Sequence, residues 1–152
     1  MKLLLAGDEE LTASEVERID AEGLGIELIW SRSPEQTLAA ITDVDALHGV
    51  PSRQAFLAAN KLRWIQYPGA GVDKVLQIEE IVKSDVVVTN CRGAFAVTMA
   101  EYTLGVILYF TRALGLCTRM QMQQYWSQTM ARPKLHEING ATLGIIGLGD
   151  TG

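Results

Sequence analysis

The chain has 152 residues, of which 48% are hydrophobic and 20% are charged, and its formal net charge is −5. This ordinary globular composition excludes a disordered or low-complexity protein, and the length allows one sizeable core without a disulfide or a structural metal. The basic residues are scattered, so we expect no nucleic-acid partner, because phosphate binding needs a concentrated positive face. The longest charge-free apolar stretch, residues 102–110, is far shorter than the ~20 residues of a membrane span, so we expect no membrane association.

The two cysteines, Cys91 and Cys117, form no CxxC pair and lie in no Cys/His cluster. This arrangement predicts no metal site. Since no signal peptide is visible either, we expect a reducing, cytoplasmic location.

Short apolar runs separated by polar segments mark the strands of the first part of the chain; they cover residues 2–6, 26–30, 46–50, 62–67 and 85–90. The runs are near-continuous rather than alternating, which is typical of parallel strands covered by helices on both faces.

Helix-capping signals lie between these runs. Thr12 with Glu15 and Ser33 with Gln36 fit the S/T-x-x-E/Q capping box. Ser52 precedes a third helix over residues 53–59. Strands that alternate with helices predict an α/β fold with a doubly wound parallel sheet of the flavodoxin type.

The pattern changes after residue 90, and we place the domain boundary between residues 96 and 97. Residues 97–116 form a long helix pattern that is apolar almost all round, so we expect burial on most sides, between two domains or in a subunit interface. A second, more polar helix over 118–128 and a connector over 131–139 follow. Residues 142–146 then have the pattern of a buried strand.

A glycine-rich turn follows this last apolar run. Gly147, Gly149 and Gly152 have the G-x-G-x-x-G spacing of a dinucleotide-binding turn, in which the backbone comes close to a pyrophosphate. The alternative is a glycine-rich strand exit without a ligand.

A second glycine-rich turn, Pro-Gly-Ala-Gly-Val-Asp, occupies residues 68–73 at the end of the fourth predicted strand. In an open α/β sheet, ligands bind at the carboxyl ends of the strands, and backbone N–H groups exposed there can bind a small carboxylate. Alternatively, Gly69 and Gly71 only supply positive φ angles for the turn, and Asp73 caps a short helix.

Four segments resemble, in order and spacing, the D-isomer-specific 2-hydroxyacid dehydrogenase family; they are LRWIQYPGAGVDKV, VVVTNCRGAFAVTMAEYTLGVILYFTRAL, Trp126 and INGATLGIIGLGDTG. The resemblance is weak before Leu62 and strong from there to Gly152. It implies a flavodoxin-like substrate domain at residues 1–96. Residues 97–152 would begin an NAD(P)-binding Rossmann domain, with its long helix and first strand.

The resemblance also implies site residues. The backbone amides of Ala70, Gly71 and Val72 would hold the carboxylate of a small 2-hydroxy or 2-keto acid, and Met99 and Thr103 would line the nicotinamide side. The residues that would contact the rest of NAD or NADP are Gly147, Gly149, Asp150, Thr151 and Gly152.

Two residues depart from the family pattern. Phe95 stands where several relatives carry a polar residue, which leaves the side-chain preference of the acid open, and Thr151 replaces the usual apolar residue of the fingerprint. The family's catalytic arginine, glutamate and histidine follow the GxGxxG motif, so we expect no catalytic residue in this chain. His48 and His136 match no catalytic position.

The expected function is therefore the N-terminal part of an NAD(P)-dependent oxidoreductase that interconverts D-2-hydroxy acids and 2-keto acids. We expect the 152-residue chain alone to be inactive and, because of its long apolar helix, to form a homodimer. One alternative is a non-catalytic carboxylate-binding or oligomerisation fragment of the same family. Another is a different Rossmann oxidoreductase with a flavodoxin-like neighbour.

Overall fold

A computed structural model describes residues 1–7 and 11–152 of the chain. These residues form two compact units, Met1–Arg92 and Gly93–Gly152, and each is described by itself. The first unit ends slightly before residue 96, where the sequence pattern placed the domain boundary.

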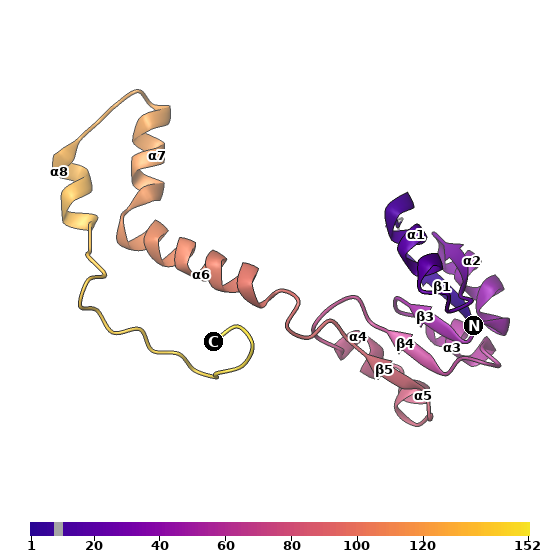
Figure 1. Ribbon diagram of the computed structural model, residues 1–152. Coiled ribbons are helices and arrows are strands. Elements are labelled where there is room, and N and C mark those ends of the chain that lie inside the picture. Colours follow the sequence, from indigo (N-terminus) through magenta and orange to yellow (C-terminus); the bar gives the residue numbers. More distant parts are fainter. Residues whose placement is uncertain (8–10) are drawn as a thin grey trace. The chain divides into compact units, whose positions relative to one another are not determined.

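The described part of the first unit is built on a five-stranded parallel sheet (Figure 1). Its strands are β1 (Lys2–Ala6), β2 (Glu27–Ser31), β3 (Ala46–His48), β4 (Trp64–Gln66) and β5 (Val87–Thr89). The order β2-β1-β3-β4-β5 is that of flavodoxin-like folds, which confirms the predicted fold class. The strands β3, β4 and β5 are shorter than their apolar runs, because only residues with a hydrogen-bonded neighbour join the ladder. In the middle of β4, for example, Ile65 pairs with Leu47 of β3 and with Val88 of β5.

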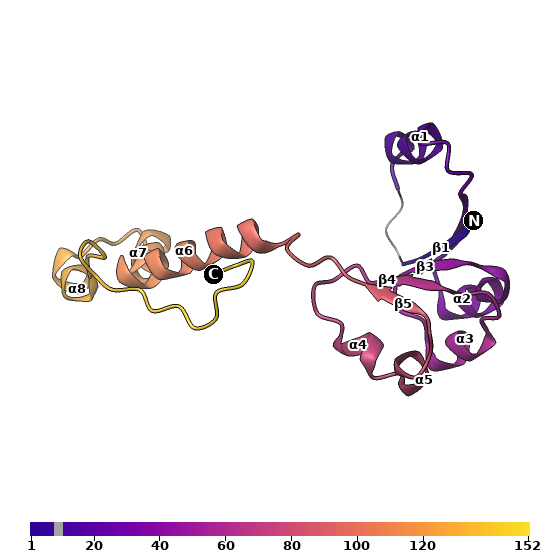
Figure 2. The same ribbon diagram turned by 60° about the horizontal axis from the view of Figure 1, so that its bottom comes forward.

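The connecting helices lie on both faces of this sheet. They are α1 (Ala13–Ala21), α2 (Pro34–Ala40) with the 3-10 turn η1 (Ile41–Asp43), α3 (Arg53–Ala58), α4 (Asp73–Leu76) and α5 (Glu79–Val82). The chain moves from β1 outward to β2 and then back across the sheet to β3, β4 and β5. Because each crossover is right-handed, the helix between β1 and β2 lies on one face of the sheet and the later helices lie on the other. Figure 2 shows α1 on one side of the sheet and α2, α3, α4 and α5 on the opposite side.

Capping bonds confirm three predicted helix starts. At α1, the Glu15 N–H donates to Thr12 Oγ1 (3.4 Å), and the Glu15 carboxylate accepts the Thr12 N–H (2.7 Å). Hydrogen bonds from the backbone and side chain of Thr12 hold the pKa of Glu15 below its usual value. Ser33 and Ser52 cap α2 and α3, where each side chain accepts a backbone N–H of the first turn.

The core lies between one face of the sheet and the helices that cover it. Leu4, Leu47 and Ile65 come from neighbouring strands, and their side chains are fully buried together with Val75 of α4. Val87 points to the other face and is 58% exposed, because α1 serves only the β1–β2 connection. The prediction that helices cover both faces is therefore wrong at the β5 edge.

Ion pairs tie Asp43, which precedes β3, to two lysines. Lys2 Nζ lies 2.8 Å from Asp43 Oδ2, and Lys61 pairs with the other carboxylate oxygen. Hydrogen bonds from Lys2 and Lys61 lower the pKa of Asp43 from 3.8 to about 2. Asp43 therefore stays charged in the folded state under mildly acidic conditions.

Acid should destabilise the first unit partly through this carboxylate. Because the folded-state pKa of Asp43 lies below its unfolded value of 3.8, the ion pairs stabilise the fold fully above that value and lose their effect as the pH falls towards about 2. The variant Asp43→Asn should therefore show a slightly flatter dependence of stability on pH in this range. Urea midpoints of both proteins measure this difference, and parallel pH profiles would contradict it.

The second unit is mainly helical, with α6 (Ala96–Thr111), α7 (Leu114–Met122), α8 (Gln128–Ala131) and the 3-10 turn η2 (Arg132–Lys134). The sequence predicted a break between the two longer helices at residue 117, and this position is wrong. The observed break lies at Ala113, whose φ of 50° and ψ of 35° are left-handed. Gly115 allows Tyr109 to lie against this corner, since a Cβ at Gly115 would be 2.7 Å from Tyr109 Cζ. An alanine carries no sequence signal for such a corner.

Residues 142–146 do not form the predicted first strand of a Rossmann sheet and have irregular structure. A strand is stable only when a neighbour takes up its backbone hydrogen bonds, and the described residues of the second unit offer it no partner strand. The apolar side chains of this region stay in solvent, where Leu148 is 84% exposed.

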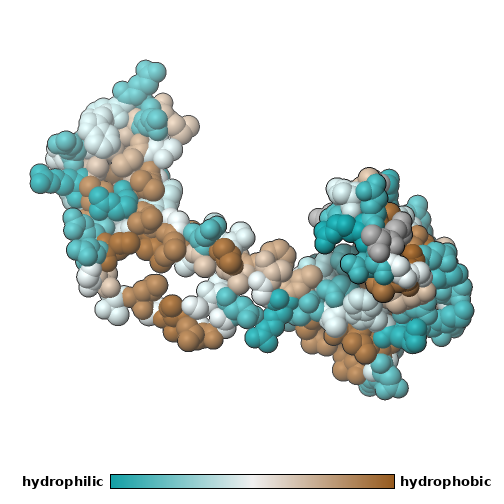
Figure 3. All heavy atoms as spheres, in the orientation of Figure 1, coloured by the Kyte–Doolittle hydropathy of each residue, from teal (hydrophilic) through white to brown (hydrophobic). Residues whose placement is uncertain are grey.

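Helix α6 is exposed where its pattern predicted burial. None of its residues is buried, and Val97, Leu104 and Phe110 are among its most exposed apolar side chains. Figure 3 shows apolar (brown) atoms at the surface of the second unit. The predicted burial therefore needs a neighbour that this unit does not itself supply.

Candidate functional site

The loop at residues 68–72 leaves the carboxyl end of β4 and leads into α4. In an open parallel sheet, this edge is where ligands bind, because the loops that follow the strands meet there. The loop contains the three residues that the family resemblance implies for carboxylate binding, Ala70, Gly71 and Val72. Ala70 and Gly71 are exposed, and Val72 is half-buried.

Neither glycine of this loop has a positive φ, so the alternative that they serve only the turn geometry is wrong. Gly69 is needed for a close approach, since a Cβ there would lie 2.6 Å from Tyr67 Cε1. A Cβ at Gly71 would meet only the Asp73 carboxylate, at 3.2 Å. Asp73 does not cap α4 either, because Val72 holds the N-cap position and no side chain bonds there. The absent side chain of Gly71 leaves its backbone open to a ligand.

The backbone N–H groups of Ala70, Gly71 and Val72 donate to no acceptor among the described residues. Three successive unpaired amides supply partial positive charge that suits a small anion. A carboxylate that accepted these amides would gain charge-assisted hydrogen bonds. The loop can therefore bind an anion without a cationic side chain.

Two residues after β5 hold this loop, and no sequence motif marks them as part of the site. Asn90 Nδ2 donates to the Ala70 carbonyl at 2.6 Å, and the Cys91 N–H donates to the Gly69 carbonyl at 3.1 Å. Both contacts join residues about twenty positions apart, so the sequence offered no local signal beyond a polar residue at a strand exit.

A chain of side-chain hydrogen bonds leads along β4 and β5 towards the same loop. Trp64 Nε1 donates to Thr89 Oγ1 at 2.7 Å, and that hydroxyl donates to Gln66 Oε1 at 2.5 Å. Gln66 Nε2 then donates to the Tyr67 carbonyl at 3.1 Å and contacts Cys91 Sγ at 3.4 Å. These bonds join neighbouring residues in and just after β4 and β5, and none of them is made to residues 68–72.

The residues predicted for the nicotinamide side lie on one face of α6. Met99 is exposed, and Thr103, one turn further on, uses its hydroxyl to donate to the Met99 carbonyl at 2.8 Å. Their spacing places both side chains on the same helix face.

The predicted fingerprint folds back on itself. Gly147 has a φ of 88°, which glycine adopts without strain, and a Cβ on Gly152 would lie 2.7 Å from the Gly147 carbonyl oxygen. Glycine is therefore required at both ends of this turn. Gly149, Asp150 and Thr151 lie between them, in the last exposed residues of the chain.

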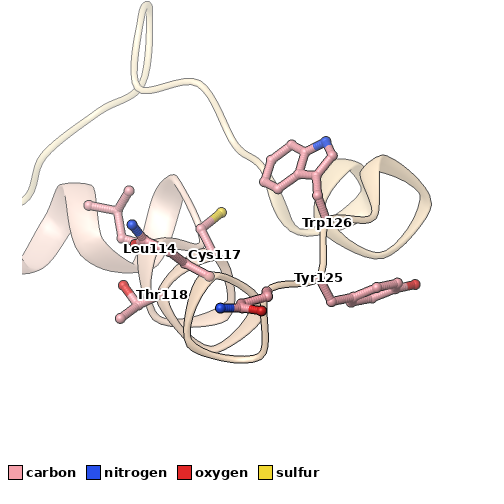
Figure 4. A pocket seen from close by; sticks show the side chains of 7 residues that line it. Leu114, Cys117, Thr118, Tyr125 and Trp126 are labelled. Carbon is pink, nitrogen blue, oxygen red and sulfur yellow. The ribbon is translucent and has the colours of Figure 1, made fainter.

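The second unit also has an open hollow of about 580 Å³ where α7 meets the turn before α8 (Figure 4). Cys117 and Trp126 line it, but none of the predicted site residues does. Both cysteines of the chain are free thiols. Among residues 1–7 and 11–152, there is no cluster of three side chains suited to a metal ion. In the same residues, the helices are too short or too polar to cross a membrane.

Among the described residues, neither histidine is a hydrogen-bond partner of the loop residues, although His48 pairs with Gln66 at the end of β4. His48 ends β3, and the backbone N–H of His136 donates to the Thr111 carbonyl at 2.7 Å. Arg112 donates to the His136 carbonyl at 3.4 Å, so this arginine holds the connector beside the end of α6.

Comparison with known proteins gives consistent results for most of the chain. Residues 4–144 match the model of the D-isomer specific 2-hydroxyacid dehydrogenase catalytic domain. A D-3-phosphoglycerate dehydrogenase of Methanocaldococcus jannaschii is 31% identical over 131 residues, which cover 84% of this chain and 24% of that protein. The chain thus spans a minor part of this relative's length.

Two solved structures share the fold. An NAD-dependent formate dehydrogenase of Staphylococcus aureus in complex with NAD has a TM-score of 0.66 at 18% identity and covers 91% of this chain and 46% of its own. A D-isomer specific 2-hydroxyacid dehydrogenase of Xanthobacter autotrophicus in complex with NADPH and MES has a TM-score of 0.69 at 20% identity. This match covers 99% of the present chain and 48% of that dehydrogenase. With the parallel sheet and the family match over residues 4–144, these findings show that the chain belongs to the D-isomer specific 2-hydroxyacid dehydrogenase family.

Proposed function

We propose that the chain is the N-terminal part of an NAD(P)-dependent oxidoreductase that interconverts D-2-hydroxy acids and 2-keto acids. Its own task is to bind the carboxylate of the small acid through the amides of Ala70, Gly71 and Val72. The observation that carries this assignment is the set of three unpaired N–H groups at the carboxyl edge of the sheet. A fixed carboxylate orients the neighbouring carbon for reaction, which is how binding lowers the entropic part of a barrier.

We infer further that the beginning of the nucleotide site lies in residues 93–152. The tight glycine turn fits a phosphate-contacting loop, because a Cβ at Gly152 would fill the space beside the Gly147 carbonyl. Gly149, Asp150 and Thr151 would contact NAD or NADP from this turn, and Met99 and Thr103 would do so from α6. The bound nucleotide would supply the hydride acceptor or donor, while this chain's residues position the acid.

The carboxylate site is tested by titrating the ¹⁵N-labelled chain with oxamate, a stable analogue of a 2-keto acid. We expect the amide resonances of Ala70, Gly71 and Val72 to shift together and to saturate. Chloride at equal ionic strength is the control for unspecific screening. Shifts confined to other parts of the chain, or equal shifts with chloride, would refute the site.

A second proposal, favoured by the exposed apolar side chains of α6, is that the chain forms a homodimer through this helix. Leu104 is 57% exposed, and apolar patches of this kind favour association. Light scattering of the chain should report a dimer, and Leu104→Arg should shift it towards the monomer. Thr98→Arg adds the same charge at an exposed polar position of α6 and should shift the oligomeric state less. A wild-type monomer at high concentration would contradict the proposal.

We also propose a cytoplasmic location, which the free thiols of Cys91 and Cys117 support, since a reducing compartment keeps cysteines unpaired.

A further inference from the structure

The residues after β5 hold two consecutive carbonyls of the carboxylate-binding loop. The Gly69 carbonyl accepts the backbone N–H of Cys91, and the Ala70 carbonyl accepts Nδ2 of Asn90. A carbonyl can only accept, so the side-chain amide of Asn90 must present its NH₂ group to Ala70. Asn90 thus contributes a side-chain hydrogen bond to the loop at residues 68–72.

These contacts fix the direction of the amides on the other side of the same peptide groups. The described peptide bonds are all trans, and a planar trans peptide holds its C=O and the following N–H in opposite directions. When the Ala70 carbonyl turns to Asn90, the Gly71 N–H must point away from the β5 exit. In the same way, the Cys91 N–H directs the Ala70 N–H away from β5 by holding the Gly69 carbonyl.

We propose that Asn90 is a positioning residue for the carboxylate site: its side-chain amide orients the Ala70–Gly71 peptide so that the Gly71 N–H faces the ligand. This inference rests on the proposed carboxylate-binding function of the loop. The bond is 2.6 Å long and joins the half-buried Asn90 side chain to the exposed Ala70 of the loop. Without this bond, the Ala70–Gly71 peptide plane would be less constrained, because glycine allows it to rotate.

The experiment compares oxamate binding by three ¹⁵N-labelled proteins: the wild-type chain, Asn90→Leu and Thr89→Val. Leucine has nearly the shape of asparagine but cannot donate to Ala70. Thr89→Val is the matched control, because it removes the neighbouring hydroxyl that bonds Trp64 and Gln66 without touching the loop contact. We expect Asn90→Leu to bind oxamate about tenfold more weakly, as for the loss of one hydrogen bond to a charged group. Thr89→Val should bind as the wild type does.

A residue-specific signal separates positioning from a general loss of structure. In Asn90→Leu, the oxamate response should be lost at Gly71 but kept at Ala70, whose amide is directed by the Cys91 contact. A through-bond coupling between Asn90 Nδ2 and the Ala70 carbonyl carbon in the wild-type chain provides a second test that needs no variant. Its absence would overturn the proposal even if Asn90→Leu did not fold.

The outcomes also separate this inference from the function on which it rests. If the wild-type chain gives no response at residues 70–72, the carboxylate site is refuted and the positioning role falls with it. If the wild type binds and Asn90→Leu binds equally well, or loses the Ala70 and Gly71 responses alike, only the positioning role is refuted.

Discussion

Replacing Gly71 with valine should weaken oxamate binding by about a hundredfold, as expected for the loss of two charge-assisted hydrogen bonds. The reason is steric: the side chain would stand over the open amides, where only the Asp73 carboxylate lies within reach of a Cβ, at 3.2 Å. The φ of Gly71 is not positive, so valine should be accepted by the backbone with little strain. Binding should therefore fall far more than stability.

The measurement is the same ¹⁵N titration, with thermal unfolding recorded for each protein. Gly144→Val is a matched control, because Gly144 has no positive φ, no atom within 4 Å of its Cβ position and no place in the loop. Gly71→Val protein that is folded and binds oxamate with wild-type affinity would show that the amides of residues 70–72 are not the site.

The 152-residue chain alone should reduce glyoxylate, pyruvate and hydroxypyruvate with NADH at no measurable rate. Interconversion of an alcohol and a carbonyl needs a proton donor and acceptor beside the reacting carbon, and the family resemblance places the arginine, glutamate and histidine of this chemistry after the GxGxxG motif. In addition, residues 142–146 form no strand, so the turn from Gly147 to Gly152 has no sheet to hold it against a nucleotide.

An absorbance assay of NADH consumption on protein verified by intact mass tests this expectation, and calorimetry should detect at most very weak NADH binding. A longer protein that continues the family pattern provides the positive control. Turnover by the 152-residue chain would mean that catalytic groups lie within it, and His48, Cys91 and Arg92 would be the first candidates.

Much of the first unit could be predicted because its signals are local. The apolar runs mark the five strands of the described sheet, and Thr12, Ser33 and Ser52 begin helices where their side chains can accept backbone N–H groups. Strand ends were less predictable, since the ladder stops where a neighbouring strand stops, whatever the hydropathy of the next residue.

The second unit was less predictable because its structure depends on neighbours. The left-handed corner at Ala113 has no glycine to announce it, and the segment 142–146 needs partner strands that the described residues lack. In the candidate site, the glycine loop was visible in the sequence, but the Asn90 contact to Ala70 was not, because folding alone brings these residues together.

The most direct test of the central claim is a crystal structure of the chain soaked with oxamate. Our account predicts a carboxylate oxygen about 3 Å from the backbone nitrogens of Gly71 and at least one of its neighbours, Ala70 and Val72. It also predicts that the Asn90 amide remains on the Ala70 carbonyl. Oxamate ordered only elsewhere on the first unit, with the amides of this loop bonded to protein acceptors, would contradict the assignment of a carboxylate site.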